Sequence, residues 1–302
     1  MAILYTEAPP SYREARLPLE LEREIFELAA HEDPKTAYAL LLVAKKVHIW
    51  IESSLYRVVV KAFHNGVFPS SPFIQKFEDA FHQGVLSPPE VKRQAFYVQH
   101  ALISRGDALP LLTMCPNIVD LAIWCSIDSH KIEISTMLPL IPIQKLSIRP
   151  TYLLKENPDY FRDTTLARSL THFDMVCVDG PFWADGWKFL SCLPRLTHLA
   201  VDGTNVYPTI EGVLRESETI TLVVRCPGTV CAPGDKNEDT EYEKRYGEDS
   251  RLVFCKYPEN PLNCWEGGAN GGQDMWNMAE SLQQVKKNRI RRLRREACQS
   301  RG

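Results

Sequence analysis

Apolar residues recur in one short pattern along most of the chain after residue 90. An apolar position is followed by two other residues, a second apolar position, any residue and a third apolar position. Four clear copies are Ile118, Leu121 and Ile123; Ile143, Leu146 and Ile148; Leu170, Phe173 and Met175; and Leu196, Leu199 and Val201. A degraded copy at Thr219, Leu222 and Val224 follows them, and an earlier copy ends in Phe96 and Val98. This alternation predicts one short strand per copy, with the anchor residues facing a core.

The spacing of these copies predicts a repeat protein. Their central positions step by 25, 25, 27, 26 and 23 residues from Phe96 to Leu222, and a period of about 20–29 residues is typical of leucine-rich repeats. Segments between the copies carry apolar residues at helical spacing, such as Trp183, Trp187 and Leu190. The Asn or Cys that regular repeats place after the last anchor is missing. We therefore expect an α/β fold, with an irregular leucine-rich-repeat-like solenoid over residues 58–257, parallel strands on one face and a C-terminal helix.

Residues 17–57 are predicted to form three short helices, after a flexible segment over residues 1–16. Leu21, Ile25 and Leu28 follow the Leu17-Pro18 pair at the spacing of one helical face. Asp33-Pro34 ends this helix and begins the next. About 40 residues cannot bury that much apolar surface alone, which indicates a binding module. A helical cap on the repeat array is the alternative.

The same segment resembles an F-box. The pattern L-P-x-E-L-x-x-x-I is matched by Leu17, Pro18, Glu20, Leu21 and Ile25, the central part by Leu42, Val43, Lys45 and Lys46, and the closing L-[WY]-R by Leu55, Tyr56 and Arg57. Val47 stands where many F-boxes have tryptophan. The fuller pattern is similar to F-box-like families of mushroom-forming fungi. The resemblance implies docking onto the adaptor subunit of an SCF-type cullin ubiquitin ligase, through Leu17, Pro18, Leu21, Ile25, Leu42, Val43 and Leu55.

The neighbours of the strand anchors are predicted to lie on the opposite face of the sheet, which we expect to be open. This stripe mixes both charge signs with one tryptophan, and Trp and Arg are favoured types at protein interfaces. A protein or peptide target therefore fits it better than a polyanion. The residues expected to contact the target are Trp124, Arg149, Asp174, Asp202 and Arg225.

No catalytic motif stands out in the chain. It contains no G-x-S-x-G, H-E-x-x-H or Walker A sequence. His172 and His198 occupy equivalent positions in adjacent repeats, so we expect them to approach each other. Their repeat placement explains them without a metal, and no Cys or carboxylate completes an obvious ligand set. The sequence predicts a non-catalytic protein without a metal or cofactor.

The C-terminal part, residues 258–302, is predicted to be a glycine-rich turn followed by a basic helix. Before it, residues 231–250 are polar and charge-dense, which predicts an exposed or disordered loop. Residues 266–273 contain the glycines, and Asp274 is expected to cap the helix. The basic run over residues 286–295 is either a solvated helix end or a nuclear-localisation signal.

Composition narrows the classes further. A net charge of −3 argues against a nucleic-acid-binding protein as a whole, and no apolar run approaches the roughly 20 residues of a membrane span. Nine cysteines without a paired spacing favour a reducing compartment, cytoplasmic and/or nuclear. The leading hypothesis is a non-catalytic substrate-recognition subunit of a ubiquitin ligase. The alternative is an F-box-like repeat scaffold for protein–protein interaction without a ligase role.

Overall fold

The computed structural model describes residues 17–32, 34–62, 79, 89–125, 127, 130–153, 162–178, 187–190, 192–203, 206–226, 236–256 and 258–299. The chain divides into two compact units, Met1–Leu55 and Tyr56–Gly302. The predicted flexible segment 1–16 and the predicted helix residue Trp183 lie outside the described residues.

The first unit is helical, as its sequence pattern predicts. Its helices are α1 (Leu19–Glu32), α2 (Pro34–Leu40) and α3 (Lys45–Tyr56). Their shared core is small and consists of Ala30, Ala37, Val47 and Ile51. Phe26 and Trp50 pack against this core, with ring centroids 6.4 Å apart. Two of the four buried core residues are alanines, so this core is too small to bury the leucines of α1 as well.

In the part of the chain that the structure describes, the second unit is an α/β structure built on one eight-stranded sheet. Its strands are β1 (Val58–Lys61), β2 (His100–Ile103), β3 (Asp120–Ile123), β4 (Lys145–Ile148), β5 (His172–Val178), β6 (His198–Gly203), β7 (Leu222–Arg225) and β8 (Leu252–Phe254). They lie in chain order and every neighbouring pair is parallel. Parallel neighbours require a crossover between consecutive strands, and helices supply much of it.

Short helices in these crossovers cover one face of the sheet. They are α5 (Pro89–Tyr97), α6 (Leu109–Met114), α7 (Lys131–Met137), η2 (Leu138–Leu140), η3 (Pro150–Tyr152), α8 (Thr165–Ser169), α9 (Trp187–Leu190), α10 (Tyr207–Glu216) and α11 (Lys236–Tyr246). The anchors Leu121, Phe173 and Leu199 are fully buried in the core between this layer and the sheet. This is the core that the repeating pattern predicts.

The strand register confirms the four clear copies of the pattern and corrects the other two, the degraded copy and the earlier copy. Leu121, Leu146, Phe173 and Leu199 lie opposite one another on adjacent strands. The next position in this row is Val223, so the predicted anchor Leu222 faces the other side of the sheet. A shift of one residue reverses every side chain of a strand.

The earliest copy is wrong for a different reason. Ala101 is the residue that lies opposite Leu121. Phe96, the predicted anchor, belongs to α5 and is 61% exposed. Val98, Ala101 and Ile103 are buried and have the spacing of the other copies. Small Ala101 at the central position hides the copy from a search for large apolar residues.

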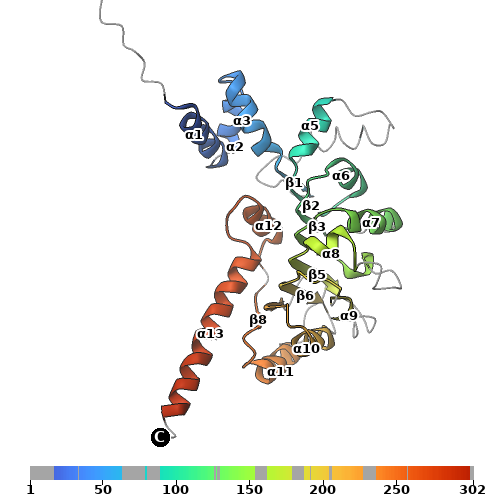
Figure 1. The fold of residues 1–302 in the computed structure, drawn as a ribbon, viewed down its shortest axis with the longest axis vertical. Helices are drawn as coiled ribbons and strands as arrows, with labels where there is room; N and C mark the ends of the chain where they lie inside the picture. The colour runs from blue at the N-terminus through green and yellow to red at the C-terminus, as the bar shows by residue number, and fades with distance from the viewer. Residues whose placement is uncertain are drawn as a thin grey trace, which may run out of the picture. The chain divides into compact units, whose positions relative to one another are not determined.

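Two C-terminal helices cover the second face of the sheet. They are α12 (Pro261–Ala269) and α13 (Met275–Gln299), and they lie on the opposite side of the strands from α6 and α7 (Figure 1). Ala269 of α12 joins an apolar cluster with Val58, Val60, Leu102 and Ala122. Trp276 and Ala279 of α13 join another, made with Ala200, Leu222, Val224, Cys226, Val253 and Cys255. The face that we expected to be open is therefore largely covered.

The C-terminal region contains more helix than its polar and glycine-rich composition predicts. Helix α11 lies within the predicted loop 231–250, and α12 extends into the predicted glycine-rich turn as far as Ala269. The cap of α13 is confirmed: the Asn277 backbone N–H donates to Asp274 Oδ1 at 2.9 Å. The Asp274 N–H in turn donates to Asn277 Oδ1 at 3.0 Å, as in a capping box.

Cys177 is disulfide-bonded, which the cysteine spacing did not indicate.

Candidate functional site

The first unit exposes a stripe of large apolar side chains along α1 and the turn after α2. Leu17, Leu21 and Ile25, spaced by four residues, are each about half exposed. Leu42 is 89% exposed and Val43 is 59% exposed. Exposed apolar surface of this extent on a small unit is typical of an interface. Pro18 is also exposed, whereas Leu55 is only partly exposed and packs against the unit's core.

Two further leucines of α1 are exposed, and one of them belongs to this apolar surface. Leu19 is 57% exposed and Leu28 is 58% exposed. Leu28 follows Leu21 by seven residues and therefore lies on the same helical face. We call Leu17, Leu21, Ile25, Leu28, Leu42 and Val43 the α1 surface.

Ion pairs support the helix that carries this surface. Lys46 of α3 donates to Glu22 of α1 at 2.6 Å, and Arg23 pairs with Glu27 at 2.7 Å one turn further along α1. The Lys46 ammonium also lies 5.6 Å from the centroid of the Trp50 ring. An apolar centre with charged groups beside it has the composition of a protein-binding patch.

In the second unit, the predicted target-binding residues are mostly inaccessible. Asp174 and Asp202 are buried, and Trp124 is half-buried. Arg225 is buried on the other face, where its guanidinium lies 5.7 Å from the Tyr207 ring centroid. Arg225 was predicted to lie on the open face because Leu222, and not Val223, was taken as the anchor of β7. Arg149, just after β4, is exposed.

Beneath α12 and α13, three of the polar side chains form a hydrogen-bonded chain. The Trp124 indole N–H donates to Ser147 Oγ at 2.7 Å, and Ser147 Oγ–H donates to Asp174 Oδ2 at 2.6 Å. Burial raises the pKa of Asp174 to about 7; the Ser147 hydrogen bond opposes this shift and the nearby Asp202 charge adds to it. The polar side chains of this covered face are therefore paired with one another.

A small cavity lies beside this chain. It has a volume of about 60 Å³ and is lined by residues of the sheet, α12 and α13, including Lys145, Trp265 and Trp276. Pockets for drug-sized ligands are several times larger, at about 300–1,000 Å³. The cavity therefore does not match a site for a ligand of that size.

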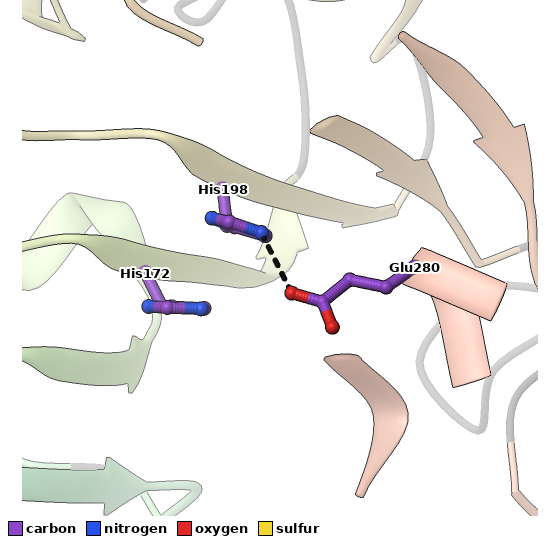
Figure 2. A group of neighbouring side chains, drawn as sticks. All are labelled: His172, His198 and Glu280. Carbon is purple, nitrogen blue, oxygen red and sulfur yellow. Dashed lines mark hydrogen bonds and ion pairs between the residues drawn. The ribbon is translucent and has the colours of Figure 1, made fainter. Parts of the chain in front are cut away.

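His172 and His198 lie next to each other on β5 and β6, as their equivalent positions predict. Their rings stack with centroids 4.2 Å apart at 16°, and the edge of Trp276 packs against both. Glu280 of α13 brings Oε1 to 3.2 Å from His198 Nε2 (Figure 2). No sequence pattern pointed to this carboxylate, because Glu280 lies 82 residues beyond His198.

The environment of the two histidines lowers both of their pKa values. Burial lowers the pKa of His172 to about 3, with further contributions from His198 and the Lys145 ammonium. Burial also lowers the pKa of His198, although the Glu280 carboxylate opposes this. Both shifts favour the uncharged form of the imidazole rings.

No protein-family model, curated protein or solved structure matches this chain. Among the described helices, none combines the length and the apolar character needed to cross a membrane. The α1 surface and the covered face of the sheet are therefore the features of the molecule that bear on its function.

Proposed function

We propose that this chain is a substrate-recognition subunit of an SCF-type cullin ubiquitin ligase, without catalytic activity of its own. The first unit, an F-box-like module, binds the adaptor subunit through the α1 surface. The second unit, a leucine-rich-repeat-like solenoid, holds the target protein. The observation that carries the proposal is the exposure of the apolar residues that match the F-box pattern.

The α1 surface supports adaptor binding because its residues contribute little to the unit's own core. Leu17, Ile25 and Leu42 are each more than half exposed, while the core is made by alanines, Val47 and Ile51. Burying such side chains against a partner contributes about 25 cal/mol for each Å² of apolar surface. The same residues match the F-box pattern in type and spacing. Leu55 is assigned to the fold of the module instead, because it packs against the core.

The second unit supports the repeat part of the proposal. Its eight strands follow one another in chain order, and the anchors of β3 to β6 lie in one row. Such an array presents an extended surface. The proposed target contact moves from the covered face to the carboxyl ends of the strands, where Arg149 follows β4 and is exposed.

A scaffold without a ligase role is the second candidate. Under that hypothesis, the apolar residues of the first helix would be buried permanently within the chain. Within the first unit, Leu17, Pro18 and Leu21 are exposed together, so the unit's own core does not bury them.

Isothermal titration calorimetry of the full chain with the purified adaptor subunit of a cullin ligase tests the proposal. We expect wild type to bind at a one-to-one ratio, and a Leu17→Asp, Ile25→Asp double variant to bind at least about 100-fold more weakly, since interface hot spots cost about 2 kcal/mol or more each. Ile132→Asp is the matched control, because Ile132 is a 76% exposed apolar residue of α7. An absence of wild-type binding, or equal binding by the double variant, would contradict the proposal.

A further inference from the structure

We infer that His172, His198 and Glu280 form a binding site for a transition-metal ion of the zinc class, which holds α13 onto strands β5 and β6. Each residue offers one ligand atom, and these atoms all lie within 4.8 Å of one another. Both imidazole rings extend from neighbouring strands toward the Glu280 carboxylate (Figure 2). The inference does not depend on the proposed ligase role.

Hydrogen bonds on the far side of the rings fix which nitrogens are available. Thr171 Oγ1 donates its single proton to the Gln144 carbonyl at 3.0 Å, and Thr197 Oγ1 donates to the Thr171 carbonyl at 3.2 Å. Each hydroxyl oxygen also contacts the Nδ1 of the following histidine, at 2.9 Å for His172 and 2.7 Å for His198. The tautomer that satisfies both contacts of each hydroxyl carries its proton on Nδ1, which donates to the threonine oxygen while the hydroxyl donates to the carbonyl.

In this tautomer the Nε2 of each ring carries the lone pair that can bind an ion. A second hydrogen bond from the other ring nitrogen is the usual way in which proteins orient a metal-binding histidine. Here two successive Thr-His pairs supply that support on adjacent strands. The edge of Trp276 also packs against both rings and limits their rotation.

The contact between His198 and Glu280 suits a shared cation. In the tautomer with the proton on Nδ1, His198 Nε2 and Glu280 Oε1 lie 3.2 Å apart and can both bind one ion; with the proton on Nε2, the same contact is a hydrogen bond that zinc would replace. Zinc bonds to His and Glu are about 2.0–2.2 Å long, so two tetrahedral ligands on one ion lie about 3.4 Å apart. The observed separation fits one shared ion. Glu280 is half exposed, so its carboxylate can adjust toward His172.

The ligand set indicates the kind of ion. Two imidazoles and one carboxylate suit Zn²⁺ and neighbouring transition metals, whereas Ca²⁺ and Mg²⁺ take oxygen ligands. The nearby Lys145 ammonium is held at 3.1 Å by Asp274 Oδ2, which offsets its positive charge. Three protein ligands leave a fourth tetrahedral position open. A bound ion would join two strands of the sheet to the helix that covers them.

The test uses the full chain, treated with a chelator and titrated with Zn²⁺ alone. We expect one ion per chain with a micromolar or tighter Kd, and a melting temperature that rises by a few degrees at zinc about 100-fold above Kd. Glu280→Gln keeps the shape of an exposed side chain and should weaken zinc binding at least tenfold. Glu296→Gln is the matched control on α13, since its carboxylate pairs with Arg292 instead.

Two further measurements make the outcome decisive. A His172→Gln variant, with its fold checked by circular dichroism, should also bind zinc at least tenfold more weakly. Substitution by Co²⁺ should give a spectrum of nitrogen and oxygen ligands without a thiolate charge-transfer band. A Kd weaker than about 1 mM, unchanged binding by Glu280→Gln, or a thiolate band that places the ion on cysteines would overturn the inference.

Discussion

Trp276 provides the most direct test of whether α13 covers the sheet. Its side chain is buried in the cluster formed by Leu222, Val224 and Ala279. Its ring also packs edge-on against His172 at 5.1 Å and His198 at 5.9 Å. Trp276→Ala removes all of these contacts at once and leaves a cavity between the helix and the sheet.

The structure sets the expected size of this effect. Replacing a buried aromatic residue by alanine costs about 3–5 kcal/mol, as lost transfer free energy plus the cavity. Trp276 retains 9% exposure, which reduces the cavity slightly. We therefore expect the free energy of unfolding of the second unit to fall by about 3–4 kcal/mol.

Urea denaturation followed by far-UV circular dichroism measures this loss. The transition midpoint should move to lower urea with little change in the m-value. Val285→Ala is the control, because Val285 lies on the same helix and is 67% exposed; its effect should stay within about 0.5 kcal/mol. A loss below about 1 kcal/mol for Trp276→Ala would refute the packing of α13 on the sheet.

Two further predictions concern the backbone and one ion pair. In thermal melts, Gly203→Ala should destabilise the chain by about 3 kcal/mol or more, because φ is +135° and a Cβ would lie 2.1 Å from the Val178 carbonyl oxygen. Gly271 has a φ of +85° and open space around it, so Gly271→Ala should cost only about 1–2 kcal/mol in the same assay. For Asp249, burial raises the pKa, but the hydrogen bonds and charge of Arg251 outweigh it and hold the pKa below its ordinary 3.8. Its stabilisation is therefore present above pH 3.8 and is lost as pH falls through the folded-state pKa. Asp249→Asn should be less stable than wild type at pH 7, and the difference should shrink in melts below pH 3.8; a constant difference would contradict this assignment.

The central strands were predictable because their alternation is local. Leu146 and Ile148 face one core, while Lys145 and Ser147 between them are polar, so one face is marked along the strand. On β7, Leu222, Val223 and Val224 are all apolar because both faces of that strand are buried. The apolar pattern then does not show which residues of β7 face which side of the sheet, and the anchor was placed one residue early.

The α1 surface was also predictable from the sequence. The helical spacing of Leu17, Leu21 and Ile25 marks one face, and their number exceeds what a unit of this size can bury. The structure adds that the core takes alanines and Ile51 instead. The motif alone does not show which of its apolar residues face inward, and the structure adds that Leu55 is partly buried against the core.

The sequence by itself determined the helices of the first unit, the strands of the repeat and the approach of His172 to His198. Each of these depends on spacing along the chain, which fixes neighbouring side chains through helical or strand geometry. Only the tertiary structure decided that α12 and α13 cover the second face and that Glu280 reaches His198. That contact joins residues 82 positions apart, and no local periodicity encodes where a helix docks after so long a separation.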